Sequence, residues 1–98
     1  MKLSEEQIER IKEYLKATPV IRAFIFGSYV RDRANEQSDV DILVELDYSN
    51  PIGLLFIKIA FDLEDILQRK VDLVTTQGIS KYILPSVQKE KFLIYERI

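Results

Sequence analysis

Two aspartates, Asp39 and Asp41, stand one residue apart at the start of an apolar segment of this 98-residue sequence. On an extended chain, side chains two positions apart leave the same face, with their Cα atoms roughly 7 Å apart. Two neighbouring carboxylates repel each other unless a cation or water compensates their charge. Carboxylate oxygens suit Mg²⁺ or Mn²⁺, which also bind phosphate oxygens and water. The pair is therefore a candidate metal site, whose alternative is a solvated loop.

A Gly-Ser pair, Gly27 and Ser28, follows another apolar segment. A glycine at a strand end lets a phosphate approach the backbone closely, and the N–H groups that start a helical turn favour an anion. The Ser28 hydroxyl adds a further donor. Together with the aspartates, this pair predicts a cradle for the metal–triphosphate unit of a nucleotide, whereas a lone Gly-Ser is usually only a turn.

A third carboxylate, Asp72, lies inside the apolar segment 71–75. An aspartate there is costly unless it is paired, hydrated or metal-bound. If this segment is a strand next to the Asp41 strand, Asp72 points into the same cleft. It is then a candidate general base, or a ligand of a metal that helps to deprotonate an attacking hydroxyl. The alternative is an edge-strand residue that faces water.

The composition excludes several other chemistries. The sequence has no cysteine and no histidine, which rules out disulfides, thiolate zinc sites and imidazole catalysis. A net charge of −2 and a pI near 5.2 give no domain-wide basic field for nucleic acid or a membrane surface. The start of the chain lacks a signal-peptide core, and no apolar run reaches the roughly 18 residues of a membrane span. We expect a single cytoplasmic domain over residues 1–98.

Alternating helices and strands must position these residues. Ser4 with Gln7 is a capping-box pattern, and it predicts a helix that ends at Thr18-Pro19. A short helical turn is expected from Ser28, and a polar loop over 33–38. The remaining expected elements are strands at 20–26, 40–46 and 71–75, helices at about 52–68 and 80–89, and a strand or extended tail at 91–98. This order predicts an α/β (α+β) fold with a small mixed β-sheet and helices packed on it.

Two of the expected helices carry an ambiguity. The apolar stripe of the helix at 52–68 is wider than one contact with a sheet needs. It predicts either a deeply buried helix or a subunit interface. The helix at 80–89 contains Pro85, which is expected to interrupt or shift it.

The spacing Gly-Ser, ten residues, Asp-x-Asp in "GSYVRDRANEQSDVD" resembles the signature of the DNA polymerase beta-like nucleotidyltransferases, and specifically their minimal prokaryotic branch (MNT). Asp72 matches the later strand aspartate that completes the triad of that family. The resemblance covers nearly the whole chain and includes the closing "LIYE". It implies the polymerase beta-like nucleotidyltransferase fold.

The resemblance also implies a reaction. ATP would be the donor, and two Mg²⁺ ions, for which Mn²⁺ could substitute, would be held by Asp39 and Asp41, with Asp72 joining them at the catalytic ion. A hydroxyl would attack the α-phosphorus, accept AMP and release pyrophosphate. Arg31, one helical turn after Ser28, is expected to contact the phosphates; Arg33 is a weaker candidate, and for both the alternative is a solvated charge.

The acceptor is not encoded in these motifs, because the residues after Asp72 are too few for the acceptor domain of larger relatives. Minimal members of the family typically act as antitoxins of HEPN-domain ribonuclease toxins, and some transfer AMP to a tyrosine of that toxin. The resemblance therefore implies a protein adenylyltransferase with a HEPN-type partner, with a homodimer as a further possibility. Two alternatives stay open, an antitoxin that acts by binding alone and a nucleotidyltransferase for RNA or a small molecule.

Overall fold

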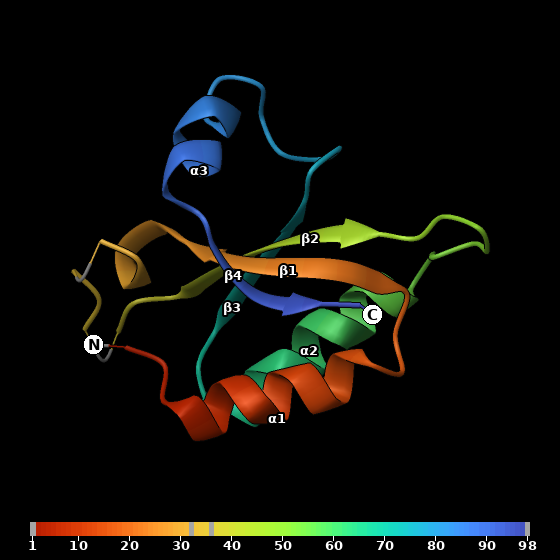
Figure 1. Cartoon of the computed structure of the whole chain (residues 1–98), viewed down its shortest axis with the longest axis horizontal. Coiled ribbons are helices and arrows are strands. Elements are labelled where there is room, and N and C mark those ends of the chain that lie inside the picture. The colour runs from red at the N-terminus through yellow and green to blue at the C-terminus, as the bar shows by residue number, and fades with distance from the viewer. Residues whose placement is uncertain (1, 32, 36, 98) are drawn as a thin grey trace.

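The computed structural model describes residues 2–31, 33–35 and 37–97, and within them a four-stranded sheet forms the centre of the molecule (Figure 1). Its strands are β1 (Val20–Phe26), β2 (Val40–Leu46), β3 (Val71–Thr75) and β4 (Phe92–Glu96), in the spatial order β3-β2-β1-β4. β1 pairs antiparallel with β2 and with β4, whereas β2 and β3 are parallel. The predicted small mixed sheet is therefore confirmed.

Helices cover both faces of the sheet (Figure 1). α1 (Glu5–Leu15) and α2 (Leu55–Leu67) lie on one face, and α3 (Leu84–Glu90) lies on the other. Strand side chains alternate between the faces, so Ile42 and Val44 join the larger core with α1 and α2 while Leu43 joins the smaller core with α3. This arrangement confirms the predicted fold class.

The capping box at the start of α1 is confirmed. The Gln7 N–H donates to the Ser4 hydroxyl at 3.1 Å, and the Ser4 N–H donates to Gln7 Oε1 at 2.8 Å. These bonds satisfy backbone donors that the first helical turn leaves without an intrahelical acceptor. α1 then packs Ile11 and Leu15 into the larger core.

α2 is shorter than expected and is not deeply buried all round. It begins at Leu55 rather than at residue 52, because Gly53 adopts a positive φ of 52° that a right-handed helix does not allow. Ile59, Leu63 and Leu67 are buried. By contrast, Phe61 is 64% exposed, and Leu54, just before the helix, is 81% exposed. The interpretation as a wholly buried helix is therefore wrong for one side of it.

The structure decides two expectations about the C-terminal segment, the effect of Pro85 and the conformation of the last residues. The helix expected at 80–89 is shifted and not interrupted: α3 begins at Leu84, and Pro85 lies in its first turn, where its missing N–H costs no hydrogen bond. Residues 80–83 form a turn in which the Ser80 carbonyl accepts from the N–H groups of Ile83 and Leu84. The following segment is a strand, β4, and its edge position leaves Phe92 and Leu93 exposed.

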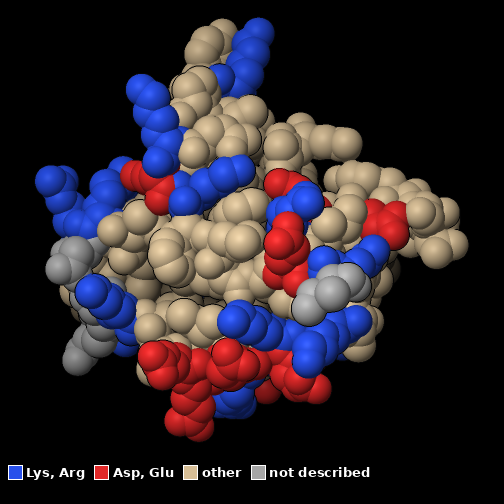
Figure 2. All heavy atoms as spheres, in the orientation of Figure 1, with Lys and Arg blue, Asp and Glu red and all other residues tan. Residues whose placement is uncertain are grey.

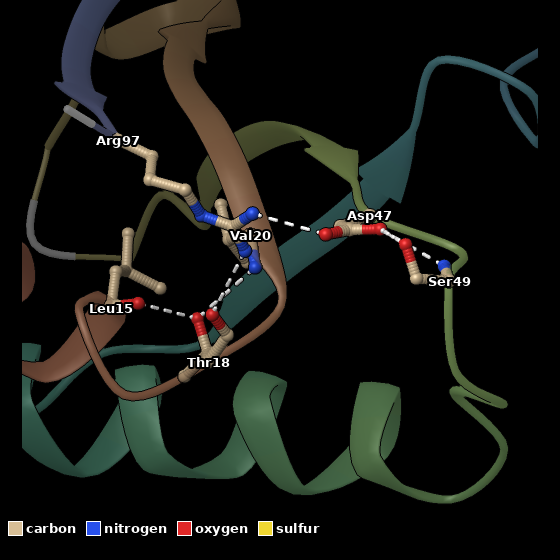
Figure 3. A network of polar contacts seen from close by, with 6 residues as sticks. All are labelled: Leu15, Thr18, Val20, Asp47, Ser49 and Arg97. Atoms are coloured by element: carbon tan, nitrogen blue, oxygen red, sulfur yellow. Dashed lines mark hydrogen bonds and ion pairs between the residues drawn. The ribbon is translucent and has the colours of Figure 1, made fainter.

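A polar network ties the chain end to two turns on the side of the sheet where β2 ends (Figure 3). Arg97 Nη1 lies 3.1 Å from Asp47 Oδ2, and Asp47 Oδ1 accepts from the Ser49 N–H and hydroxyl. The Thr18 hydroxyl donates to the Leu15 carbonyl at 2.7 Å, which closes the turn after α1. The network lies far along β2 from Asp41, so we assign it to the fold and not to the site.

Surface charge is mixed on the face seen in Figure 2, with acidic side chains gathered in the region that α1 occupies in Figure 1. The basic side chains are spread over this face and are more frequent than acidic ones on its left and upper parts. Within the described parts of the chain, none of the helices has the length and apolar character needed to cross a membrane. Residues 1, 32, 36 and 98 lie outside the described residues, so the expected loop over 33–38 is described only in part.

Candidate active site

Asp41 and Asp72 lie opposite each other on the parallel strands β2 and β3. Each is the second residue of its strand. Partners in this register project their side chains to the same face of a sheet, which here is the face of Leu43, Val74 and the smaller core. The expectation that Asp72 shares a face with Asp41 is thus met by the strand register.

Asp39 precedes β2 and is exposed, but its charge still acts on Asp41. Burial, followed by the negative charges of Asp72 and Asp39, raises the pKa of Asp41 to about 6 from its ordinary value of 3.8. Arg31 acts in the opposite direction, because its positive charge favours the carboxylate. The three aspartates therefore share one electrostatic environment.

The Gly-Ser pair packs directly against this carboxylate group. Phe26, the last residue of β1, pairs with Asp41, and the 3₁₀ turn η1 (Gly27–Tyr29) follows at once. Gly27 has a φ of 76°, and a Cβ built on it would overlap Oδ2 of Asp41. Glycine is needed here twice, for the backbone conformation and for the space. The turn begins one residue earlier than expected, at Gly27 rather than at Ser28.

Ser28 and Arg31 lie on the same turn. The Gly27 carbonyl accepts from the N–H groups of Val30 and Arg31, both at 3.1 Å, and the Ser28 carbonyl accepts from the Arg33 N–H at 2.9 Å. Ser28 is half-buried, whereas the Arg31 and Arg33 side chains are exposed. The positive charge of Arg31 reaches Asp41 strongly enough to affect its pKa, and the phosphate contacts expected for the two arginines stay predictions.

One residue at this site gave no signal in the sequence. Glu90, at the end of α3, accepts a hydrogen bond from the Gly27 N–H at 3.0 Å and lies 3.5 Å from Nη1 of Arg31. It is 63 positions from Gly27, and no motif includes it. Only the packing of α3 against the sheet brings it to the turn.

The donor set of the three aspartates suits a hard divalent cation, since it consists of carboxylate oxygens alone. Among the described residues, however, no three acidic side chains already converge as a set of metal ligands. A surface hollow of about 370 Å³ is bordered by Tyr48, Phe56 and Gly78, beyond the end of β3 that lies opposite Asp72. The metal role of the three aspartates therefore stays a prediction.

Comparison with known proteins places the chain in a family. The family described as "Nucleotidyltransferase domain" matches residues 5–97. Protein adenylyltransferase MntA of Thermococcus cleftensis is 40% identical over 93 residues, which are 90% of this chain and 93% of that protein. The chain therefore belongs to the nucleotidyltransferase domain family, and the resemblance indicated by the Gly-Ser and Asp-x-Asp signature is confirmed, as is the prediction of a nucleotidyltransferase enzyme.

Solved structures agree in fold. One provisionally described as a minimal nucleotidyltransferase is 26% identical, with a TM-score of 0.77 over 89% of this chain and 88% of that one. A toxin–antitoxin crystal structure with AMP-PNP has a TM-score of 0.75 at 22% identity, over 97% of this chain and 75% of that one. A tri-AMPylated HEPN toxin of Shewanella oneidensis in complex with an MNT antitoxin matches with a TM-score of 0.70 at 18% identity, over 97% of this chain and 74% of that one.

Proposed function

We propose that this protein is an antitoxin that transfers AMP from ATP to a hydroxyl group, and that the acceptor is a tyrosine of a HEPN-type toxin. The observation that carries the proposal is the position of Asp41 opposite Asp72, directly beside Gly27. The relative at 40% identity is named a protein adenylyltransferase, which supports protein as the class of acceptor. The toxin–antitoxin structures of the same fold support the nucleotide and the partner.

Asp39, Asp41 and Asp72 would hold the divalent ions. Their shared electrostatic environment fits this role, since the negative charges that raise the pKa of Asp41 are those that a cation would compensate. When bound, two Mg²⁺ ions would supply positive charge that stabilises the entering and leaving oxygens. Mn²⁺ has the same preference for oxygen ligands and is expected to substitute.

Gly27, Ser28 and Arg31 would bind the phosphates. The space that a Gly27 side chain would fill holds the Asp41 carboxylate, so Gly27 contributes by letting the turn pack against Asp41. The Ser28 hydroxyl on this turn can donate to a phosphate. Arg31 is exposed and near Asp41, so its guanidinium can reach phosphate oxygens beside the carboxylates. The site would then hold anion and cation side by side.

The reaction is a displacement at the α-phosphorus of ATP. The acceptor oxygen forms a bond to that phosphorus, the bond from it to the oxygen that bridges to the β-phosphate breaks, and pyrophosphate leaves with the bonding electrons. The proton of the acceptor hydroxyl passes to a carboxylate, for which Asp72 is our candidate because it lies opposite Asp41 and is exposed.

Neutralisation by contact alone is a second candidate, and one observation favours it. Leu54, Ile57 and Phe61 at α2 are between 50% and 81% exposed, and exposed apolar side chains of this size are typical of a surface that associates. This alternative requires no chemistry from the three aspartates.

The decisive experiment combines the protein with α-labelled ATP, Mg²⁺ and a HEPN-type toxin. We expect label on a tyrosine of the toxin and loss of its toxicity. Asp41→Asn is expected to abolish both. If Asp41→Asn still neutralises the toxin, contact alone suffices; if label appears on RNA or on a small molecule instead, the acceptor class is wrong.

A further inference from the structure

Glu90 links the last helix to the Gly27–Ser28 turn. Its Oε1 accepts the Gly27 N–H at 3.0 Å, and its Oε2 lies 3.5 Å from Nη1 of Arg31. The Glu90 side chain is only 21% exposed, so its carboxylate is largely withdrawn from water. The Glu90 side chain therefore contacts the Gly27 N–H and the Arg31 guanidinium, which both belong to residues proposed to bind the phosphates.

The place of Glu90 at the end of its own helix does not favour a glutamate. As the last residue of α3, Glu90 places a negative charge at the negative end of the helix dipole. It also lies near enough to Asp41 for the two negative charges to repel each other. Both effects are unfavourable, so the favourable contacts of Glu90 are those with Gly27 and Arg31.

Gly27 is held from two sides by carboxylates. Oδ2 of Asp41 fills the space beside its Cα, and Glu90 accepts its N–H. Gly27 is buried, so without Glu90 its N–H would lose its partner away from water. The turn would then be free to relax away from the positive φ that brings it against Asp41.

We infer that Glu90 is a positioning residue of the nucleotide site, which fixes the Gly27–Ser28 turn and Arg31 relative to Asp41 before ATP binds. The inference rests on the proposed function. A turn that is ordered in advance loses less conformational freedom when the ligand binds, so its effect appears in the affinity for ATP. Glu90 acts through Gly27 and Arg31 and makes no contact with the reacting atoms.

Two substitutions at Glu90 test whether its hydrogen bond from the Gly27 N–H determines the affinity for ATP. Glu90→Gln retains an oxygen that can accept the Gly27 N–H, and we expect its Kd for ATP with Mg²⁺, measured by calorimetry, to stay within about threefold of wild type. Glu90→Ala removes the acceptor, and we expect about tenfold weaker binding, the size of effect of one buried hydrogen bond. Gln88→Ala, an exposed change in the same helix, is the matched control and should bind as wild type.

Amide hydrogen exchange by NMR gives a readout that needs no nucleotide. The Gly27 amide should exchange faster in Glu90→Ala than in wild type, and should keep its protection in Glu90→Gln and Gln88→Ala. This measurement also shows whether each variant is folded, because the core strands report their own protection.

The outcomes distinguish the inference from the function on which it rests. Wild-type affinity in a folded Glu90→Ala variant would overturn the positioning role, and so would tighter binding by Glu90→Gln, which would make Glu90 a competitor of the phosphates. A wild-type protein that binds no ATP with Mg²⁺ refutes the proposed function and with it a role at a nucleotide site. The Gly27 exchange rates would then still decide whether Glu90 holds the turn.

Discussion

Gly27 lies so close to Asp41 that the carboxylate oxygen Oδ2 occupies the space where any other residue at position 27 would place its Cβ. The contact follows from the pairing of Phe26 with Asp41, which puts the turn after β1 beside the second residue of β2. The two parts of the sequence signature are therefore one structural unit. A change at Gly27 must also disturb Asp41.

Gly27→Ala should abolish detectable binding of ATP and also destabilise the fold. A positive φ costs an alanine about 1–2 kcal/mol, and the overlap with Asp41 adds to it. Calorimetric titration with ATP and Mg²⁺, together with a urea unfolding curve, measures both effects. Because of the overlap, we expect Gly27→Ala to lose more stability than the backbone cost of a positive φ alone.

Gly53→Ala is the matched control for this substitution. Gly53 also has a positive φ, 52°, but a Cβ there would meet nothing within 4 Å. We expect a similar backbone cost and unchanged affinity for ATP. Equal loss of ATP binding in both variants would show that general destabilisation, and not the contact with Asp41, is responsible.

Asp41→Asn should stabilise the metal-free protein while removing activity. The pKa of Asp41 is raised from 3.8 to about 6 in the folded protein, so folding favours the protonated side chain. The resulting contribution to stability is fully present below pH 3.8 and is lost as the pH rises through 6. The neutral asparagine avoids that loss. At pH 7.5 we expect a gain of about 1 kcal/mol, after allowance for screening of a half-buried group, or roughly 4–8 °C in Tm.

Thermal unfolding in the presence of a chelator, at pH 7.5 and at pH 4, tests this pH dependence. The gain should be present at the higher pH and nearly absent at the lower one. Asp65→Asn, on the exposed side of α2, removes the same charge away from the site and should show neither effect. A variant less stable than wild type at pH 7.5 would contradict the electrostatic account of the three aspartates.

ATP should raise the Tm of the wild-type protein only when Mg²⁺ or Mn²⁺ is present. A ligand at 100 times its Kd stabilises the folded state by about 2.7 kcal/mol, which a thermal shift assay detects readily. Asp72→Asn, which removes the charge opposite Asp41, should lose most of this shift. A shift of wild-type size in Asp72→Asn would place Asp72 outside the site. The same shift with ATP and chelator would contradict the metal requirement.

The strands were predictable because their side chains alternate with a period of two. That period puts Asp41 on the face of Leu43, and the parallel register places Asp72 beside it. The bounds of α2 and α3 were less predictable. They depend on the backbone conformation of Gly53 and on the position of Pro85 in a first turn, which periodicity of apolar residues does not report.

The candidate site was predictable to the extent that it is local in sequence. Gly27, Ser28, Asp39 and Asp41 share one motif, whose spacing is visible in the chain. Glu90 could not be found in this way, because its contact with Gly27 spans 63 positions and depends on how α3 packs on the sheet. The exposure of Phe61 likewise depends on which side of α2 meets the sheet.

The network around Asp47 predicts a second pH dependence, at the other end of the sheet from the aspartates (Figure 3). Hydrogen bonds from the Ser49 hydroxyl and N–H, followed by Arg97, lower the pKa of Asp47 to about 2 from 3.8. The contribution of Asp47 to stability is therefore present above pH 3.8 and is lost as pH falls toward 2. Asp47→Asn should remove this part of the acid sensitivity, measured as the urea midpoint at pH 5 and at pH 2.5. Its Kd for ATP at pH 7.5 should equal that of wild type, and weaker binding would show that this network, which we assign to the fold, also supports the site.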